Sequence, residues 1–344
     1  MEQVNLSRYV PGGIVGKGAD YEVRAAVDRE TGKQVVLKRP WPQTLRHQQH
    51  GGIEARTDRV LQAYQEVGHT IPTLVPILGY TDRANHDAYF GETLGREYRV
   101  IVEERALGIP LVGDPMARIT GIPIGIGQNL FALFPLAQPP GASPSGIHAQ
   151  LLDLEEAFFR AGYIVLDLRP QNIFYQPASG RITVIDCGAL VGKDTAAPRR
   201  GRPPQGIHDF YLEMLKFYTT SHLPPARAGG YRDPYGLQPV VSFEEELERL
   251  TRNFTGASDP AVQASALSII GRLRQRAYAA FSDFRRDLAA YLDAVQVAHQ
   301  GLPNLAEARQ AWAEALEWLR AEYWQRYLFD PETELAAFDR ANPS

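Results

Sequence analysis

The chain has 344 residues, of which 44% are hydrophobic and 22% are charged, and its formal net charge at pH 7 is −4. A chain of this length exceeds the size at which one hydrophobic core usually stops growing, so two lobes or domains are expected. The nearly balanced charge and the lack of an apolar run of about 20 residues predict neither nucleic acid nor a membrane as a partner.

The first hundred residues have the pattern of short strands separated by turns. Strands are predicted at residues 14–15, 21–27, 34–37 and 98–102, and the turn 30–33 contains a glycine and has the length of a hairpin loop. Between the strands, apolar residues recur at helical spacing from Ile53 to Val67, which predicts one amphipathic helix. This part is therefore expected to be an antiparallel sheet with one helix.

The pattern changes after Arg105. Residues 108–144 are rich in glycine and proline, and helical patterns follow. Helices are predicted at 148–162, 209–218, 242–254, 260–299 and 304–326, and short buried strands at 164–165 and 182–185. The fold class is therefore expected to be α+β, with a mostly helical C-terminal part.

A glycine-containing turn joins the first two expected strands. It reads Gly16-Lys17-Gly18-Ala19-Asp20-Tyr21-Glu22-Val23, and Lys38 ends a strand about twenty residues later. Glycines let a backbone approach phosphates closely, and the loop N–H groups can donate to phosphate oxygens. Taken singly, these features also fit an ordinary β-turn and a solvated strand lysine.

The segment 164–175 is more specific, because a polar turn with Asp167 and Asn172 separates two apolar strands. Phosphoryl transfer needs a carboxylate near the attacking hydroxyl, and an amide oxygen nearby can bind a metal ion. Asp186 follows another buried strand and precedes a glycine. A hard oxygen ligand at that position suits magnesium, although Asp and Asn are also common turn residues.

These four features occur in one order along the chain: glycine loop, strand lysine, Asp-x-x-x-x-Asn and strand-Asp-x-Gly. In this order the set resembles the protein-kinase superfamily. The resemblance implies a bilobal kinase-like fold, with an N-lobe of antiparallel strands plus one helix, a mostly helical C-lobe and a C-terminal helical extension. The implied bounds are 1–105, 106–300 and 301–344.

The resemblance also implies roles for individual residues. Asp167 and Lys38 would be catalytic, and Asn172 and Asp186 would hold Mg²⁺. ATP would be bound by the loop and by the edge of the fifth strand, with Val102 bordering the adenine pocket and a helix glutamate, Glu54, pairing with Lys38; Asp58 is the alternative. The complete set of implied ATP-binding residues is Gly16, Lys17, Gly18, Val23, Lys38, Glu54, Val102, Glu103 and Arg105.

The sequence departs from the family pattern at several points. Tyr21 stands at the third loop glycine, Val165 and Leu166 replace the usual His-Arg, and Cys187 replaces the usual Phe. No Ala-Pro-Glu motif follows Asp186. The expected function is an ATP- and Mg²⁺-dependent Ser/Thr protein kinase, with a small-molecule kinase and a pseudokinase or nucleotide-sensing scaffold as alternatives.

The remaining expectations concern partners and compartment. The partner would be a protein or a small molecule that accepts phosphate, and the C-terminal helices could bind a further protein. Cys187 is the only cysteine, so no internal disulfide can form, as in a reducing compartment. The start Met1-Glu2-Gln3 lacks the basic and apolar runs of a secretory signal, and a cytoplasmic location is expected.

Overall fold

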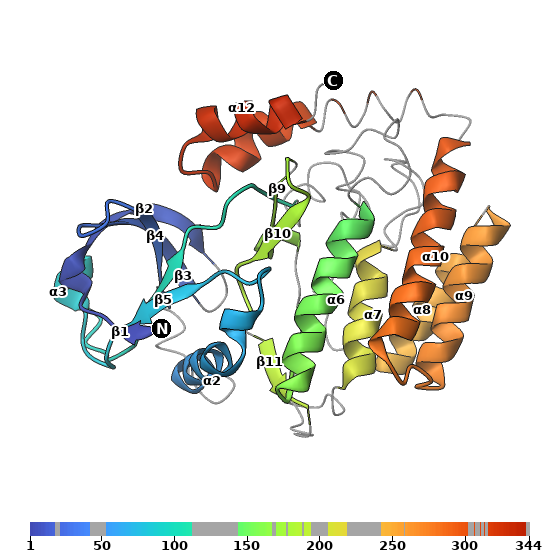
Figure 1. Cartoon of the computed structure of the whole chain (residues 1–344), viewed down its shortest axis with the longest axis horizontal. Helices are drawn as coiled ribbons and strands as arrows, with labels where there is room; N and C mark the ends of the chain where they lie inside the picture. The colour runs from blue at the N-terminus through green and yellow to red at the C-terminus, as the bar shows by residue number, and fades with distance from the viewer. Residues whose placement is uncertain are drawn as a thin grey trace.

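The fold is α+β, with a mixed sheet and one helix at one end and a group of helices at the other (Figure 1). The computed structural model describes residues 1–17, 21–41, 53–111, 144–166, 170–176, 178–187, 189–193, 206–218, 242–257, 259–301, 306, 310, 313 and 316–341. Every statement on the structure below concerns these residues.

The larger sheet has the strand order β1-β5-β6-β4-β3-β2. Neighbouring strands in this sheet run antiparallel, except for β1 and β5, which run parallel. The strands are β1 (Glu2–Gln3), β2 (Tyr9–Lys17), β3 (Tyr21–Asp28), β4 (Gln34–Pro40), β5 (Ile77–Tyr80) and β6 (Ile101–Glu104).

The β3–β4 hairpin is fixed by its loop. Gly32 has a φ of 69°, a left-handed conformation that glycine adopts without a Cβ clash. Asp28 accepts hydrogen bonds from the Arg8 guanidinium at 2.8 Å, the Glu30 N–H at 3.0 Å and the Thr31 hydroxyl at 2.8 Å. These donors, with Arg8 contributing most, hold the pKa of Asp28 well below its usual value.

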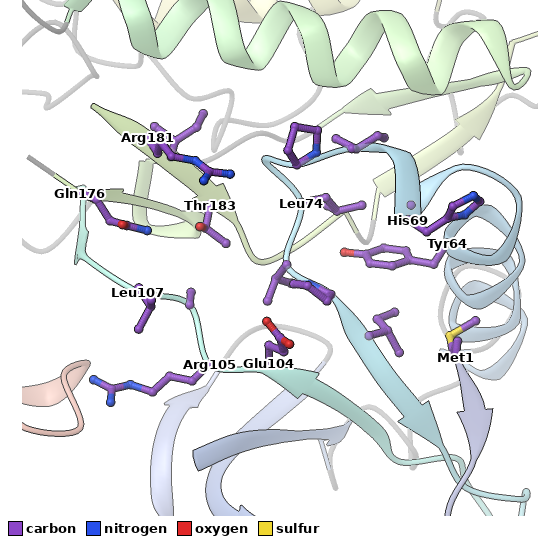
Figure 2. A pocket seen from close by; sticks show the side chains of 18 of the residues that line it. Met1, Tyr64, His69, Leu74, Glu104, Arg105, Leu107, Gln176, Arg181 and Thr183 are labelled. Carbon is purple, nitrogen blue, oxygen red and sulfur yellow. The ribbon is translucent and has the colours of Figure 1, made fainter. Parts of the chain in front are cut away.

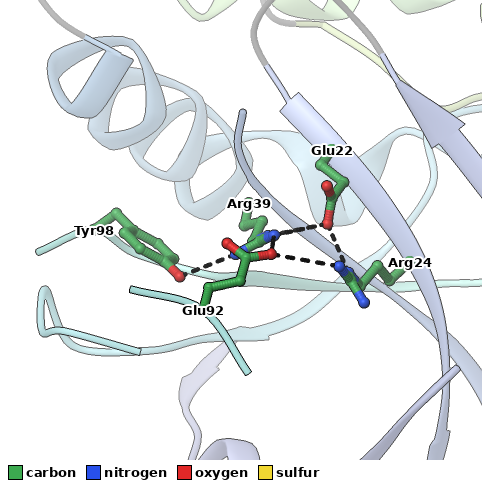
Figure 3. A network of polar contacts seen from close by, with 5 residues as sticks. All are labelled: Glu22, Arg24, Arg39, Glu92 and Tyr98. Atoms are coloured by element: carbon green, nitrogen blue, oxygen red, sulfur yellow. Dashed lines mark hydrogen bonds and ion pairs between the residues drawn. The ribbon is translucent and has the colours of Figure 1, made fainter. Parts of the chain in front are cut away.

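A buried ion-pair network braces the sheet on one face (Figure 3). Arg39, fully buried on β4, donates to Glu22 on β3 at 2.9 Å and to the Tyr98 hydroxyl at 3.3 Å. Glu92 accepts from the same guanidinium at 3.0 Å, and Arg24 approaches Glu22 at 2.6 Å. Because each buried charge meets an opposite charge, the strands can hold these groups without leaving one unpaired.

Helix α2 (Ile53–Glu66) packs beside the larger sheet, and short elements follow its strands. These are η1 (Leu6–Arg8), η2 (Gly68–Thr70) and α3 (Asp87–Phe90). The outer face of the sheet has its own core, which includes Leu37, Tyr98 and Val102.

Two smaller sheets lie between the larger sheet and the helices. In the first, β9 (Ile173–Gln176) pairs with β10 (Arg181–Val184) on one side and β7 (Ile109–Pro110) on the other. In the second, β8 (Tyr163–Leu166) pairs with β11 (Ala189–Gly192). The turn η3 (Pro170–Asn172) leads into β9.

The helical part contains α6 (Pro144–Arg160), α7 (Ile207–Tyr218), α8 (Phe243–Thr255), α9 (Pro260–Arg274) and α10 (Phe281–Gln300). Ser242 and Glu245 form a capping box at the start of α8. Asp259 caps α9, whose first residue is proline. Among the described residues, each helix is too short or too polar to cross a bilayer.

Three expectations on the elements are corrected. The helix expected over 260–299 is broken between Arg274 and Phe281, where Arg276 has a φ of 50°. The strand expected at 98–102 lies at 101–104. The described part of 304–326 ends in a π turn, η4 (Leu319–Tyr323), and a 3-10 turn, η5 (Trp324–Arg326), before an unexpected helix, α12 (Pro331–Ala341).

Candidate functional site

Strand pairing brings the glycine turn and Lys38 onto one face of the larger sheet. Gly16 lies opposite Val23, Val23 opposite Lys38, and Lys38 opposite Ile101. Residues paired directly across antiparallel strands share a face. Gly16, Val23 and Lys38 therefore lie on one face, whereas Gly18 lies outside the described residues.

Lys38 is almost completely buried and faces two carboxylates. Its Nζ lies 3.3 Å from Asp186 Oδ1 and 3.9 Å from Glu103 Oε1, and it donates to the Ile185 carbonyl oxygen at 3.5 Å. Burial by itself would lower the pKa of Lys38, but the charges of Asp186 and Glu103 outweigh it and raise the pKa. Lys38 is therefore an ammonium group at neutral pH.

The β9–β10 hairpin sets Asn172 beside the segment that carries Asp186. Ile173 pairs with Val184, and the Ile185 N–H donates to the Asn172 carbonyl oxygen at 2.9 Å. The side chain of Asp186 is 37% exposed, so a ligand can reach it. The two predicted metal ligands thus come from adjacent ends of one hairpin.

Asp167, the predicted catalytic carboxylate, lies outside the described residues. The residue before it, Leu166, ends β8 and pairs with Ala189, three positions after Asp186. Within the described residues, no group of three His, Cys, Asp or Glu side chains is arranged to hold a metal ion.

The expected partner of Lys38 on the helix is corrected. Glu54 lies 3.7 Å from Arg83, and Asp58 lies 3.1 Å from Arg99. Both predicted partners therefore pair with arginines outside the site, and the carboxylates that contact Lys38 are Asp186 and Glu103.

Thr57, between Glu54 and Asp58 on α2, faces the site instead. Its hydroxyl is hydrogen-bonded to the hydroxyl of Tyr21. The Tyr21 ring is buried and lies 5.0 Å from Lys38 Nζ, as a cation–π contact. An aromatic ring therefore occupies the space between the helix and the lysine.

The expected position of Val102 beside the nucleotide is also corrected. Val102 pairs with Leu37 and belongs to the core on the outer face of the sheet. Glu103 pairs with Val36, so its side chain lies on the Lys38 face. Because side chains alternate along a strand, Glu103 and not Val102 faces Lys38. Burial raises the pKa of the Glu103 carboxyl to about 7, although the charge of Lys38 acts to lower it.

The other two predicted nucleotide-binding residues lie further from Lys38. The Lys17 ammonium lies 4.8 Å from the ring of Trp41. Arg105 donates to Gln34, forms an ion pair with Glu334 of α12, and stacks on Phe329 at 4.4 Å. The side chain of Arg105 therefore ties the segment after β6 to the C-terminal end of the described chain.

That C-terminal end packs on the same segment. Trp324 donates its indole N–H to the Pro110 carbonyl oxygen at 3.1 Å, and the Tyr323 hydroxyl donates to the Leu111 carbonyl oxygen at 3.5 Å. Both rings are buried. We call residues 104–111, which begin with the last residue of β6 and include β7, the linker.

A cavity of about 880 Å³ adjoins the linker (Figure 2). Its lining includes Tyr64 and His69 from the region of α2, Glu104 and Arg105 from the linker, and Arg181 from β10. Lys38 and Asp186 are not among its lining residues, so the cavity and the lysine cluster are separate places in the fold.

A family model described as Las1-like matches residues 295–326, about a tenth of the 344-residue chain. The match covers the end of α10 and the turns η4 and η5. A comparison with curated proteins finds no match.

The resemblance to the protein-kinase superfamily is corrected by this comparison, because the matching family model is Las1-like. The resemblance was carried by short motifs of glycine, lysine, aspartate and asparagine, which also occur at ordinary turns and strand ends. Cys187 and Tyr21 already departed from the family pattern.

Proposed function

We propose that the chain is an ATP- and Mg²⁺-dependent phosphotransferase that acts on a hydroxyl group. The observation that carries the proposal is the 3.3 Å contact between Lys38 and Asp186, which joins the larger sheet to the segment after β10. A lysine beside an aspartate is a common way to hold nucleotide phosphates and their magnesium ion.

The proposal assigns a separate task to each residue of the cluster. The Lys38 ammonium would bind the α- and β-phosphate oxygens, and the backbone around Gly16 would cover them. Asp186 and the amide oxygen of Asn172 suit Mg²⁺, a hard cation that prefers oxygen ligands and that neutralises charge on the transferred phosphoryl group. Asp167 would orient the acceptor hydroxyl and take up its proton.

We further propose that the two parts of the fold act as two lobes with the nucleotide between them. The backbone from Glu103 to Arg105 would then form the edge that binds adenine. A serine or threonine hydroxyl of a protein is the favoured acceptor, and a small-molecule alcohol is the alternative. The C-terminal helices remain a candidate surface for a protein partner.

One observation favours a second function, a nucleotide-binding scaffold without turnover. The Tyr21 ring lies 5.0 Å from Lys38 Nζ and is anchored to Thr57, so it fills space beside the ammonium group. A ring in this place could hinder closure of the glycine turn over the phosphates. Such a protein would bind Mg-ATP but transfer no phosphate.

Calorimetric titration with Mg-ATP tests the proposal. Wild type should bind, and its melting temperature should rise, because ligand that binds only the folded state adds about 2.7 kcal/mol at a hundredfold excess over Kd. Asp186→Asn should lose most of the magnesium dependence. Asp82→Asn changes an exposed aspartate elsewhere and serves as the control. Absence of heat and of a melting shift in wild type would refute nucleotide binding.

A further inference from the structure

We propose that Glu103 is the residue that positions Lys38 for phosphate binding, in place of a carboxylate from helix α2. This inference rests on the proposed function and names one more residue of the same site. Its first support is direct contact, since the Glu103 carboxylate lies 3.9 Å from Lys38 Nζ. The side chains of Lys38 and Glu103 are only 9% and 7% exposed, so water screens their attraction weakly.

The backbone of Glu103 is held from both sides. Glu103 pairs with Val36 on β4 and with Ile77 on β5, so it sits inside the sheet rather than at an edge. Lys38 lies on β4 two residues after Val36 and shares its face. The two charges are therefore fixed relative to each other by one sheet, without depending on the position of a helix.

Helix α2 has no charged group in this place. The hydroxyl of Thr57 contacts Tyr21 and the Ile53 carbonyl oxygen. The Tyr21 ring stands between that hydroxyl and the Lys38 ammonium.

Stability alone does not explain a glutamate at this position. A buried ion pair is often no more stabilising than an apolar pair of the same volume, because both charges lose their hydration. Val102 and Val100, one and three positions earlier in the chain, are buried and apolar, as is usual where a segment only packs. A functional role for the carboxyl group therefore explains better than stability why a glutamate occupies this position.

The cluster also contains more acidic than basic groups. One ammonium faces two carboxyl groups, Asp186 at 3.3 Å and Glu103 at 3.9 Å. When Asp186 binds a metal ion, that ion neutralises part of its negative charge, and the attraction between Asp186 and Lys38 becomes weaker. Glu103 then remains as the anchor that keeps the ammonium in place.

The test compares Glu103→Gln, Glu103→Asp and the control Glu97→Gln, an exposed glutamate before β6. Mg-ATP affinity and phosphate transfer are measured for each, together with the melting temperature. Because misplacement of a reacting group by about 1 Å can cost about a hundredfold in rate, Glu103→Gln should lower kcat/KM by 10- to 100-fold. At pH 7 its melting temperature should stay within about 4 °C of that of wild type, and Glu103→Asp should recover part of the loss in kcat/KM.

Glu103→Met, which buries no amide, keeps the test available should Glu103→Gln fail to fold. Glu103 variants within twofold of wild type, together with a Lys38→Met variant that has lost activity, would overturn the inference and leave the proposed function standing. A wild type that binds no Mg-ATP would instead overturn the proposed function, and the inference with it.

Discussion

Truncation of Trp324 tests whether the C-terminal end of the described chain is part of the core. The indole is fully buried, lies 5.4 Å from the ring of Phe338, and donates to the Pro110 carbonyl oxygen at 3.1 Å. Replacing a buried tryptophan by alanine costs about 3–5 kcal/mol, and the carbonyl left without its donor adds about 1 kcal/mol. Trp324→Ala should therefore lower the free energy of unfolding by about 4–6 kcal/mol.

This loss in the free energy of unfolding predicts a decrease in the melting temperature. An unfolding entropy of about 2.1 cal/mol/K per residue gives roughly 0.7 kcal/mol/K for 344 residues that unfold together. The expected decrease in melting temperature is therefore about 6–8 °C by differential scanning calorimetry. Trp324→Phe keeps most of the apolar contact and should lose about 1–2 kcal/mol.

Arg326→Ala is the matched control, because Arg326 lies in the same turn and its side chain is 66% exposed. Its exposed ion pair with Glu322 should be worth less than about 1 kcal/mol. If Trp324→Ala melts within a degree of Arg326→Ala, the C-terminal end does not pack on the linker as described, and the reasoning is refuted.

Three further predictions concern the sheet and the site. Arg39→Met should destabilise the protein by about 1.5–3 kcal/mol in urea unfolding, because the buried carboxylate of Glu22 loses one of its two arginine partners and keeps only Arg24; a loss below about 0.5 kcal/mol would contradict this. Tyr21→Phe and Thr57→Val should each cost about 1 kcal/mol, and a double-mutant cycle should show coupling between them, whereas additive losses would mean that the hydroxyls do not interact. The pKa of Glu103 is about 7 in the folded protein and roughly 4.3 in the unfolded chain, so the folded state holds the proton more tightly. The resulting stabilisation is complete below about pH 4.3 and is lost as the pH rises through about 7. Between pH 5 and 8 the unfolding free energy of wild type should therefore fall relative to Glu103→Gln, by up to about 3 kcal/mol, and parallel curves would argue against a titrating Glu103.

The sequence predicted the local elements where pattern and turn chemistry agree. The β3–β4 hairpin followed from alternation around Gly32, and α2 followed from helical spacing between Ile53 and Val67. The break after Arg274 was missed because the apolar spacing continues across it, and only the left-handed conformation of Arg276 reveals it. The short strand β5 was missed because Pro76 and Gly79 read as turn residues.

The sequence proposed residues for the site but could not give their contacts. Lys38 and Asp186 lie 3.3 Å apart, although 147 residues stand between them in the chain. The prediction that Glu54 pairs with Lys38 was wrong, because the spacing of residues along a helix does not show whether a ring such as Tyr21 lies between the helix and the lysine. The register between β4 and β6 determines whether Val102 or Glu103 lies on the Lys38 face, because a shift of one residue exchanges the two faces of a strand. An alternation count from Lys38 through the pairing of β4 and β6 would have found Glu103.

The central claim is transfer of phosphate from ATP, and incubation with γ-labelled ATP and Mg²⁺ tests it most directly. Wild type and Asp167→Asn should be incubated with and without a cell lysate, and labelled protein separated from labelled small molecules. The account predicts magnesium-dependent transfer by wild type and a loss of about 10²–10⁴-fold in Asp167→Asn, the usual cost of removing a general base. Mg-ATP binding by both proteins, with no labelled acceptor in any fraction, would contradict phosphoryl transfer and favour the scaffold.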